Sequence, residues 1–159
     1  MSDDARFEDG GERPLRLRAF DPEDLQVISS VIQDSVFPIT EMTWQRRPRR
    51  FAILLNRFRW EDAEAAGRRG RPFERVQSVL TVEDVVHVAS QGIDRSDTET
   101  VLSILSVSFA PGADGTGRLT LTLAGDGAVA IDVEALEVTL SDVTRPYIAP
   151  SRKAPDHPD

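Results

Sequence analysis

Residues 80–85 read LTVEDV and residues 138–143 read VTLSDV, so one pattern of apolar, Thr, apolar, polar, Asp and Val occurs twice. Each copy closes a similar series of two earlier apolar segments with turns between them, over about residues 37–88 and 101–143. Alternation of apolar and polar residues is typical of half-buried strands. The sequence therefore predicts two tandem three-stranded β units related by a pseudo-twofold axis.

The most apolar strand candidate is residues 51–60, FAILLNRFRW. One of its faces carries Phe51, Ile53 and Leu55, and the same face continues with Arg57 and Arg59. The first half is apolar on both faces, as in a strand that is covered on both sides. We therefore expect the second half to open one face to solvent or to a ligand, and residues 61–74 to form a long mobile loop.

A helix start is encoded in residues 20–25, FDPEDL. Asp21 suits the N-cap and Pro22 the first helical position, where no backbone N–H is needed. The helix is expected to reach about Ser35, because the residue before Pro38 is pushed out of the helical region. The preceding residues 15–20 alternate and predict a strand.

The strand after the turn at residues 124–128 changes its apolar phase. Odd-numbered positions are apolar up to Val133, and even-numbered positions are apolar from Leu136 onward. A strand changes face in this way when one residue is inserted, so the pattern predicts a β-bulge near Glu134 and Ala135.

Together these elements predict an α+β protein in which one or two helices pack on a mostly antiparallel sheet, barrel-like or a sandwich. We expect a single domain over residues 14–148. The ends, residues 1–13 and 149–159, hold few apolar side chains and are expected to be disordered tails.

Composition excludes several kinds of chemistry. The chain has no cysteine, which rules out disulfides, thiolate nucleophiles and Cys-ligated metal centres, and its two histidines are His87 and His157. No catalytic residue, cofactor or metal site is predicted. The acidic N-terminus and the lack of an apolar run of roughly 18–20 residues predict a cytoplasmic protein with no membrane partner.

The charge of the chain is unevenly distributed. Residues 45–75 hold ten arginines and four acidic residues, which leaves −14 on the rest of a chain whose net charge is −8. Arg57 and Arg59 lie about 6.5–7 Å apart on one strand face, and four more arginines flank Pro48. Arginines beside aromatic rings bind phosphates and stack on bases, although they could also neutralise acidic residues elsewhere in the chain. The candidate binding residues are Trp44, Arg46, Arg47, Arg49, Arg50, Arg57, Arg59 and Trp60.

Four segments resemble a family of short alphaproteobacterial proteins of unknown function. They are residues 50–61 (RFAILLNRFRWE), 74–76 (ERV), 25–34 (LQVISSVIQD) and 132–134 (DVE). The likeness covers about residues 15–147 and implies a bacterial, cytoplasmic setting. The family has no assigned activity, so no catalytic residues carry over.

Three functions follow in order of preference. The first is a non-catalytic binding or accessory module that contacts nucleic acid, a phosphorylated ligand or an acidic protein through the arginine-rich strand face. The second is a scaffolding protein that self-associates through apolar strand edges, for example as a homodimer. The third is an enzyme that uses carboxylates, with Mg²⁺ as a candidate metal and Asp132 and Glu134 as candidate groups.

Overall fold

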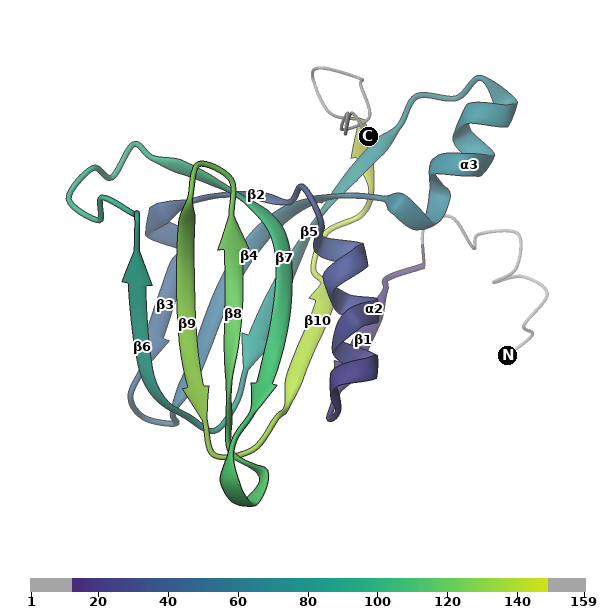
Figure 1. Cartoon of the computed structure of the whole chain (residues 1–159). Helices are drawn as coiled ribbons and strands as arrows, with labels where there is room; N and C mark the ends of the chain where they lie inside the picture. Colours follow the sequence, from purple (N-terminus) through teal and green to yellow (C-terminus); the bar gives the residue numbers. More distant parts are fainter. Residues whose placement is uncertain (1–12, 149–159) are drawn as a thin grey trace.

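The computed structural model describes residues 13–148, so the predicted tails lie outside the described residues apart from Arg13. The described part is α+β: a mostly antiparallel sheet of eleven strands with two α-helices, as predicted (Figure 1). The first strands are β1 (Arg16–Ala19), β2 (Val36–Pro38), β3 (Met42–Gln45), β4 (Arg50–Phe58) and β5 (Glu74–Val82). The others are β6 (Val85–Gln91), β7 (Val101–Pro111), β8 (Gly117–Leu123), β9 (Gly127–Val133), β10 (Val138–Asp142) and β11 (Tyr147–Ile148). The helices are α2 (Pro22–Ile32) and α3 (Trp60–Arg69), with single 3₁₀ turns at Ile39–Glu41 and Ala113–Gly115.

The sheet runs in the order β1-β10-β5-β4-β2-β7-β8-β9-β6, while β3 pairs with β4 and β11 pairs with β5. The short strand β2 joins its two halves, because Val36 lies opposite both Asn56 of β4 and Ser103 of β7. Apolar side chains from both halves, among them Ile53 and Ile131, belong to one core. The sheet therefore bends over a single core, and it does not close into a barrel.

Helix α2 begins as its sequence predicts. The Asp21 carboxylate accepts a hydrogen bond from the Asp24 N–H, and Leu25, Ile28 and Ile32 are buried. The helix packs against β7 and β1. It ends at Ile32 rather than near Ser35, because the chain turns there and the Asp34 N–H donates to the carbonyl of Ile104 in β7.

The expectation of a loop over residues 61–74 is wrong, because Trp60–Arg69 forms helix α3. Glu61 and Asp62 occupy its first turn and Arg68 and Arg69 its last, so both ends carry charges that complement the helix dipole. Gly70 ends the helix in the left-handed conformation, with φ of 67°. Strand β4 accordingly ends at Phe58, and α3 projects from one corner of the molecule (Figure 1).

The predicted bulge near Glu134 is wrong as well. The chain leaves one half of the sheet at Val133 and re-enters the other at Val138, so β9 pairs with β8 and β6 while β10 pairs with β5 and β1. The change of apolar phase reflects this crossing.

The two quoted segments lie side by side in the sheet. Val138 lies opposite Val82 and Leu140 opposite Leu80, in antiparallel register. The last strand of the predicted second unit therefore joins the first unit, and the consecutive hairpins are β3-β4-β5 and β7-β8-β9. A duplication of the two units stays a prediction.

Candidate functional site

The eight candidate residues are divided between the two ends of β4. Arg50 and Arg57 are seven residues apart on this strand, which is roughly 23 Å at the rise of a strand. We call residues 44–50 the turn end and residues 57–62 the helix end of β4. Trp44 lies at the turn end, opposite Phe51, and Trp60 opens α3 at the helix end. The structure thus does not bring the eight residues to one surface.

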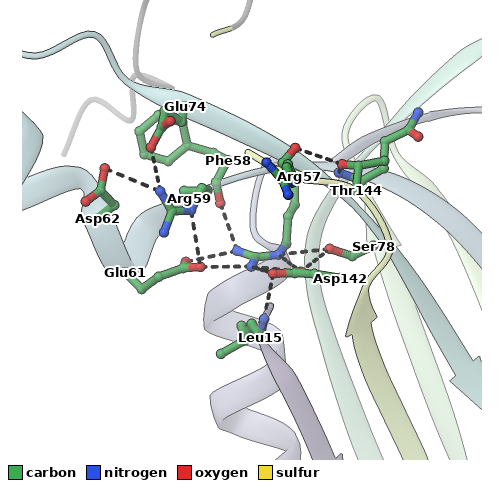
Figure 2. A network of polar contacts seen from close by, with 12 residues as sticks. Leu15, Arg57, Phe58, Arg59, Glu61, Asp62, Glu74, Ser78, Asp142 and Thr144 are labelled. Atoms are coloured by element: carbon green, nitrogen blue, oxygen red, sulfur yellow. Dashed lines mark hydrogen bonds and ion pairs between the residues drawn. The ribbon is translucent and has the colours of Figure 1, made fainter. Parts of the chain in front are cut away.

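Arg57 lies inside the protein at the helix end. Its side chain is 0% exposed, because it follows Phe51, Ile53 and Leu55 on the inward face of β4. Figure 2 shows its guanidinium between two carboxylates. It donates to both oxygens of Glu61 at 2.9 Å and to Asp142 at 3.0 and 3.1 Å.

The carboxylate of Asp142 is the buried counterpart of this cation. Its side chain is 4% exposed and follows Val138 and Leu140 on the inward face of β10. It also accepts hydrogen bonds from the Ser78 hydroxyl at 2.6 Å and from the Leu15 backbone N–H at 2.8 Å. Buried charges are tolerated when they are paired and hydrogen-bonded in this way. The group joins β4, β5 and β10 to the segment that precedes β1.

Arg59 is also buried, with 4% of its surface exposed. Its guanidinium lies 2.5 Å from Glu74 Oε1, 3.5 Å from Asp62 and 3.8 Å from Glu61. The Trp60 indole N–H donates to the carbonyl of Gln33 at 3.0 Å. Arg59 therefore attaches α3 to β5, and the half-buried Trp60 attaches it to the end of α2. Arg59, like Arg57, is buried and not available to a partner.

These contacts shift the pKa of the groups at the helix end. Burial alone would raise the pKa of Glu61, but the hydrogen bonds and charge of Arg57 hold it below its ordinary value. Burial likewise opposes ionisation of Asp62, yet its contacts with Arg71 and Arg59 lower the pKa of that carboxyl. For Arg57, burial favours the neutral form, and the Glu61 and Asp142 carboxylates outweigh it and raise the pKa. All three groups are therefore charged at neutral pH.

At the turn end, two arginines are neutralised by acidic residues. Arg49 donates to the Glu134 carboxylate at 2.6 and 3.3 Å, and this hydrogen bond lowers the pKa of Glu134. Arg50 donates to Glu83 at 2.9 Å. The Arg49 carbonyl also accepts a hydrogen bond from the Val85 N–H at 3.0 Å, which fixes the turn to the start of β6.

Arg46 and Arg47 differ from the other arginines of the cluster. Both are exposed in the turn between β3 and β4. Among residues 13–148, neither side chain has a hydrogen bond or ion pair. They follow Trp44, whose ring is half-buried. The turn end therefore presents two uncompensated cations next to an aromatic side chain.

Two hollows lie between β3 and β6, and we call them together the β3–β6 groove. The smaller, of about 90 Å³, is mostly apolar and is lined by Met42, Trp44, Phe51, Val88, Ala89, Ser90, Arg95 and Val129. The larger and more open one, of about 370 Å³, is lined by Trp44, Arg46, Arg49, Val85, Val86 and His87. Trp44 lines both hollows. Among these residues, the sequence reasoning missed Val88 of β6 and Arg95 of the loop after it, which the fold brings to the hollow that Trp44 lines.

The candidate catalytic carboxylates are engaged in ion pairs. Asp132 accepts from Arg118 at 2.7 and 3.2 Å, and this hydrogen bond holds the pKa of Asp132 below its usual range. His87 Nδ1 lies 3.7 Å from the same carboxylate. Within residues 13–148 there is no group of three or more His, Asp or Glu side chains that could hold a metal ion. In the same range, no helix is long and apolar enough to cross a membrane.

The family model described as "Protein of unknown function (DUF2948)" matches residues 15–157, so the chain belongs to this family. Comparison with curated proteins and with solved structures finds no match.

Proposed function

We propose that this DUF2948 protein is a non-catalytic binding or accessory module that contacts an anionic partner at the turn end of β4, through Arg46 and Arg47 beside Trp44. The observation that carries the proposal is the contrast within one cluster. Arg49, Arg50, Arg57 and Arg59 are all paired with carboxylates, whereas Arg46 and Arg47 are exposed and have no ion pair within residues 13–148. In a chain of net charge −8, adjacent uncompensated cations are available to a partner's anions.

The chemistry of the site limits the class of partner. A guanidinium presents a planar set of donors that fits phosphate or carboxylate oxygens, and an aromatic ring beside it can stack on a base or cover an apolar group. Nucleic acid, a phosphorylated ligand and an acidic protein all carry such groups. A bacterial, cytoplasmic setting belongs to the proposal and is supported by the family resemblance alone.

The test is a titration of a fluorescent single-stranded oligonucleotide and of polyphosphate at several salt concentrations, comparing wild type with R46E/R47E. A control variant, R68E/R69E, makes the same change of charge at two exposed arginines at the end of α3. We expect R46E/R47E to weaken binding and R68E/R69E to leave it nearly unchanged. For the oligonucleotide, loss of two phosphate contacts should reduce the slope of log K against log salt by about 1.4. Equal affinities in all three proteins would refute the site.

Self-association is a second candidate, favoured by one observation. Strand β6 ends the sheet, and Val86 on it is 48% exposed. An edge of this kind can pair with the edge of a second copy. Light scattering that shows a dimer stable at high salt would favour this alternative, since the arginine contacts are weakened by salt whereas strand pairing is not.

A further inference from the structure

We propose that the partner is a protein that contributes an extended acidic segment, which adds a strand to the edge of β6 and lies in the β3–β6 groove. This inference rests on the proposed function and gives its partner a chemical class. Strand addition draws its affinity from backbone hydrogen bonds and its specificity from pockets for alternate side chains. The structure provides both kinds of feature next to Arg46 and Arg95.

The backbone of the groove is open along both sides. Among the described strands, β6 pairs with β9 alone and β3 pairs with β4 alone. The edges are joined where the Val85 N–H donates to the Arg49 carbonyl, at the start of β6. Alternate residues of β6 direct their N–H and C=O groups away from β9. From Val86 to Gln91, these outer groups therefore have no partner strand within residues 13–148.

A β-bulge sets the side-chain phase of this edge. The register between β6 and β9 shifts between Val85 and His87, so Val86 is the inserted residue. After the bulge, Val88, Ala89 and Ser90 line the smaller hollow, and the exposed His87 lines the larger one. Bulges re-aim side chains at sheet edges and beside binding sites. This one directs Val88 of β6 to the hollow that Trp44 also lines.

The lining of the groove matches an acidic peptide with an apolar residue in it. Met42, Phe51 and Val129 wall the smaller hollow, whose 90 Å³ suit one aliphatic side chain rather than a whole ligand. Arg95 lies at this hollow and Arg46 at the larger one, and neither has an ion pair within the described part of the chain. Carboxylates on both sides of the apolar residue would meet these two cations.

A peptide explains the groove better than a nucleic acid does. The outer edge of β6 offers alternating donors and acceptors at the spacing of a strand, which peptide groups can match and phosphodiesters cannot. Phosphates would use the arginines and leave the apolar hollow and the open edge without a role.

The experiment measures binding of the labelled peptide acetyl-Glu-Asp-Val-Glu-Val-Asp-Glu-amide by fluorescence anisotropy. Two versions carry N-methyl groups on one or the other set of alternate peptide nitrogens, with charge and side chains unchanged. We expect methylation of one set to lower the affinity at least tenfold and methylation of the other set to have little effect. R46E/R95E should also weaken binding, and R68E/R69E should not. Bound peptide should slow hydrogen exchange at amides between Val86 and Gln91.

The outcomes separate this inference from the proposed function. If methylation of the one set and methylation of the other both leave the peptide affinity unchanged, strand addition is overturned and the arginine site is retained. Strand addition is also overturned, and the arginine site kept, if the peptide does not bind while polyphosphate binds to wild type and not to R46E/R47E. If neither probe depends on Arg46, both proposals fail. A salt-stable dimer that excludes the peptide from β6 would assign the edge to a second copy of the chain and overturn the inference.

Discussion

The strand face that carries Arg57 is predicted correctly from the sequence, but the exposure of its side chain is not. The sequence predicts a face open to solvent or a ligand, and the side chain is buried. Its phase with Phe51, Ile53 and Leu55 is visible in the sequence and is found in the structure. The face stays buried at that point because Asp142, 85 residues away, supplies the opposite charge. An arginine that follows one apolar strand face and an aspartate that follows another are a signal for such a pair. The pairing of β10 with β5 that brings them together was not predicted.

The buried pair predicts a large effect of Asp142→Ala on stability. The change leaves Arg57 with one carboxylate, and it removes the acceptor of the Ser78 hydroxyl and the Leu15 N–H. We expect the free energy of unfolding to fall by about 3 kcal/mol or more in urea denaturation, since breaking a buried ion pair leaves a buried charge without its partner. Glu137→Ala breaks the exposed pair with Arg18 and should cost about 1 kcal/mol or less. Similar small losses in both variants would show that the network does not hold the sheet together.

Glu61 predicts an acid-dependent loss of stability. Its pKa in the folded protein lies below the ordinary value of 4.5, so above about pH 4.5 the carboxylate is ionised in both states and its contribution is complete. As the pH falls below 4.5, the unfolded chain takes up the proton first, and the free energy of unfolding decreases until the lowered pKa is passed. Urea denaturation over this range should show a smaller decrease for Glu61→Gln than for wild type. Parallel curves for the two proteins would contradict the assigned shift.

At the scale of elements, local signals predicted α2 because its cap and proline act through neighbouring residues. Helix α3 was missed although Glu61 and Asp62 lie in its first turn and Gly70 ends it, because residues 61–74 were interpreted as one loop. The glycines and arginines of residues 67–71 lie at the end of the helix and just beyond it. The crossing from β9 to β10 was mistaken for a bulge, since alternation reports which face is buried and not which strand lies alongside.

Two glycines of α3 give opposite predictions for the same substitution. Gly67 lies within the helix and an added Cβ meets nothing within 4 Å, so Gly67→Ala should stabilise α3 by about 0.5–1 kcal/mol. An added Cβ at Gly70 meets nothing either, but φ is 67° there, so Gly70→Ala should destabilise the end of the helix by about 1 kcal/mol. Hydrogen exchange of the α3 amides should slow in the first variant and quicken in the second. Changes of the same sign would refute the assignment of Gly70 as the left-handed cap.

At the scale of the whole molecule, the sequence was sufficient for the α+β class and the antiparallel sheet, since the helix follows from its local cap and the strands follow from alternation and their turns. It was insufficient for the order of the strands, and the proposed binding surface depends on that order. The turn end and the helix end lie on opposite ends of β4, and Trp44 lines one hollow with Val88 and Arg95 only because the sheet bends over its core. The arginine cluster that is continuous in sequence is therefore separated into residues that hold the fold and residues that remain exposed.

That separation is tested most directly by measuring, on the same R46E/R47E protein, the affinity for polyphosphate and the free energy of unfolding. Arg46 and Arg47 are exposed and make no ion pair in the described part of the chain, so we predict weaker, less salt-dependent binding with stability within about 0.5 kcal/mol of wild type. Unchanged affinity, or a loss of stability as large as that expected for Asp142→Ala, would contradict the division of the cluster between fold and recognition.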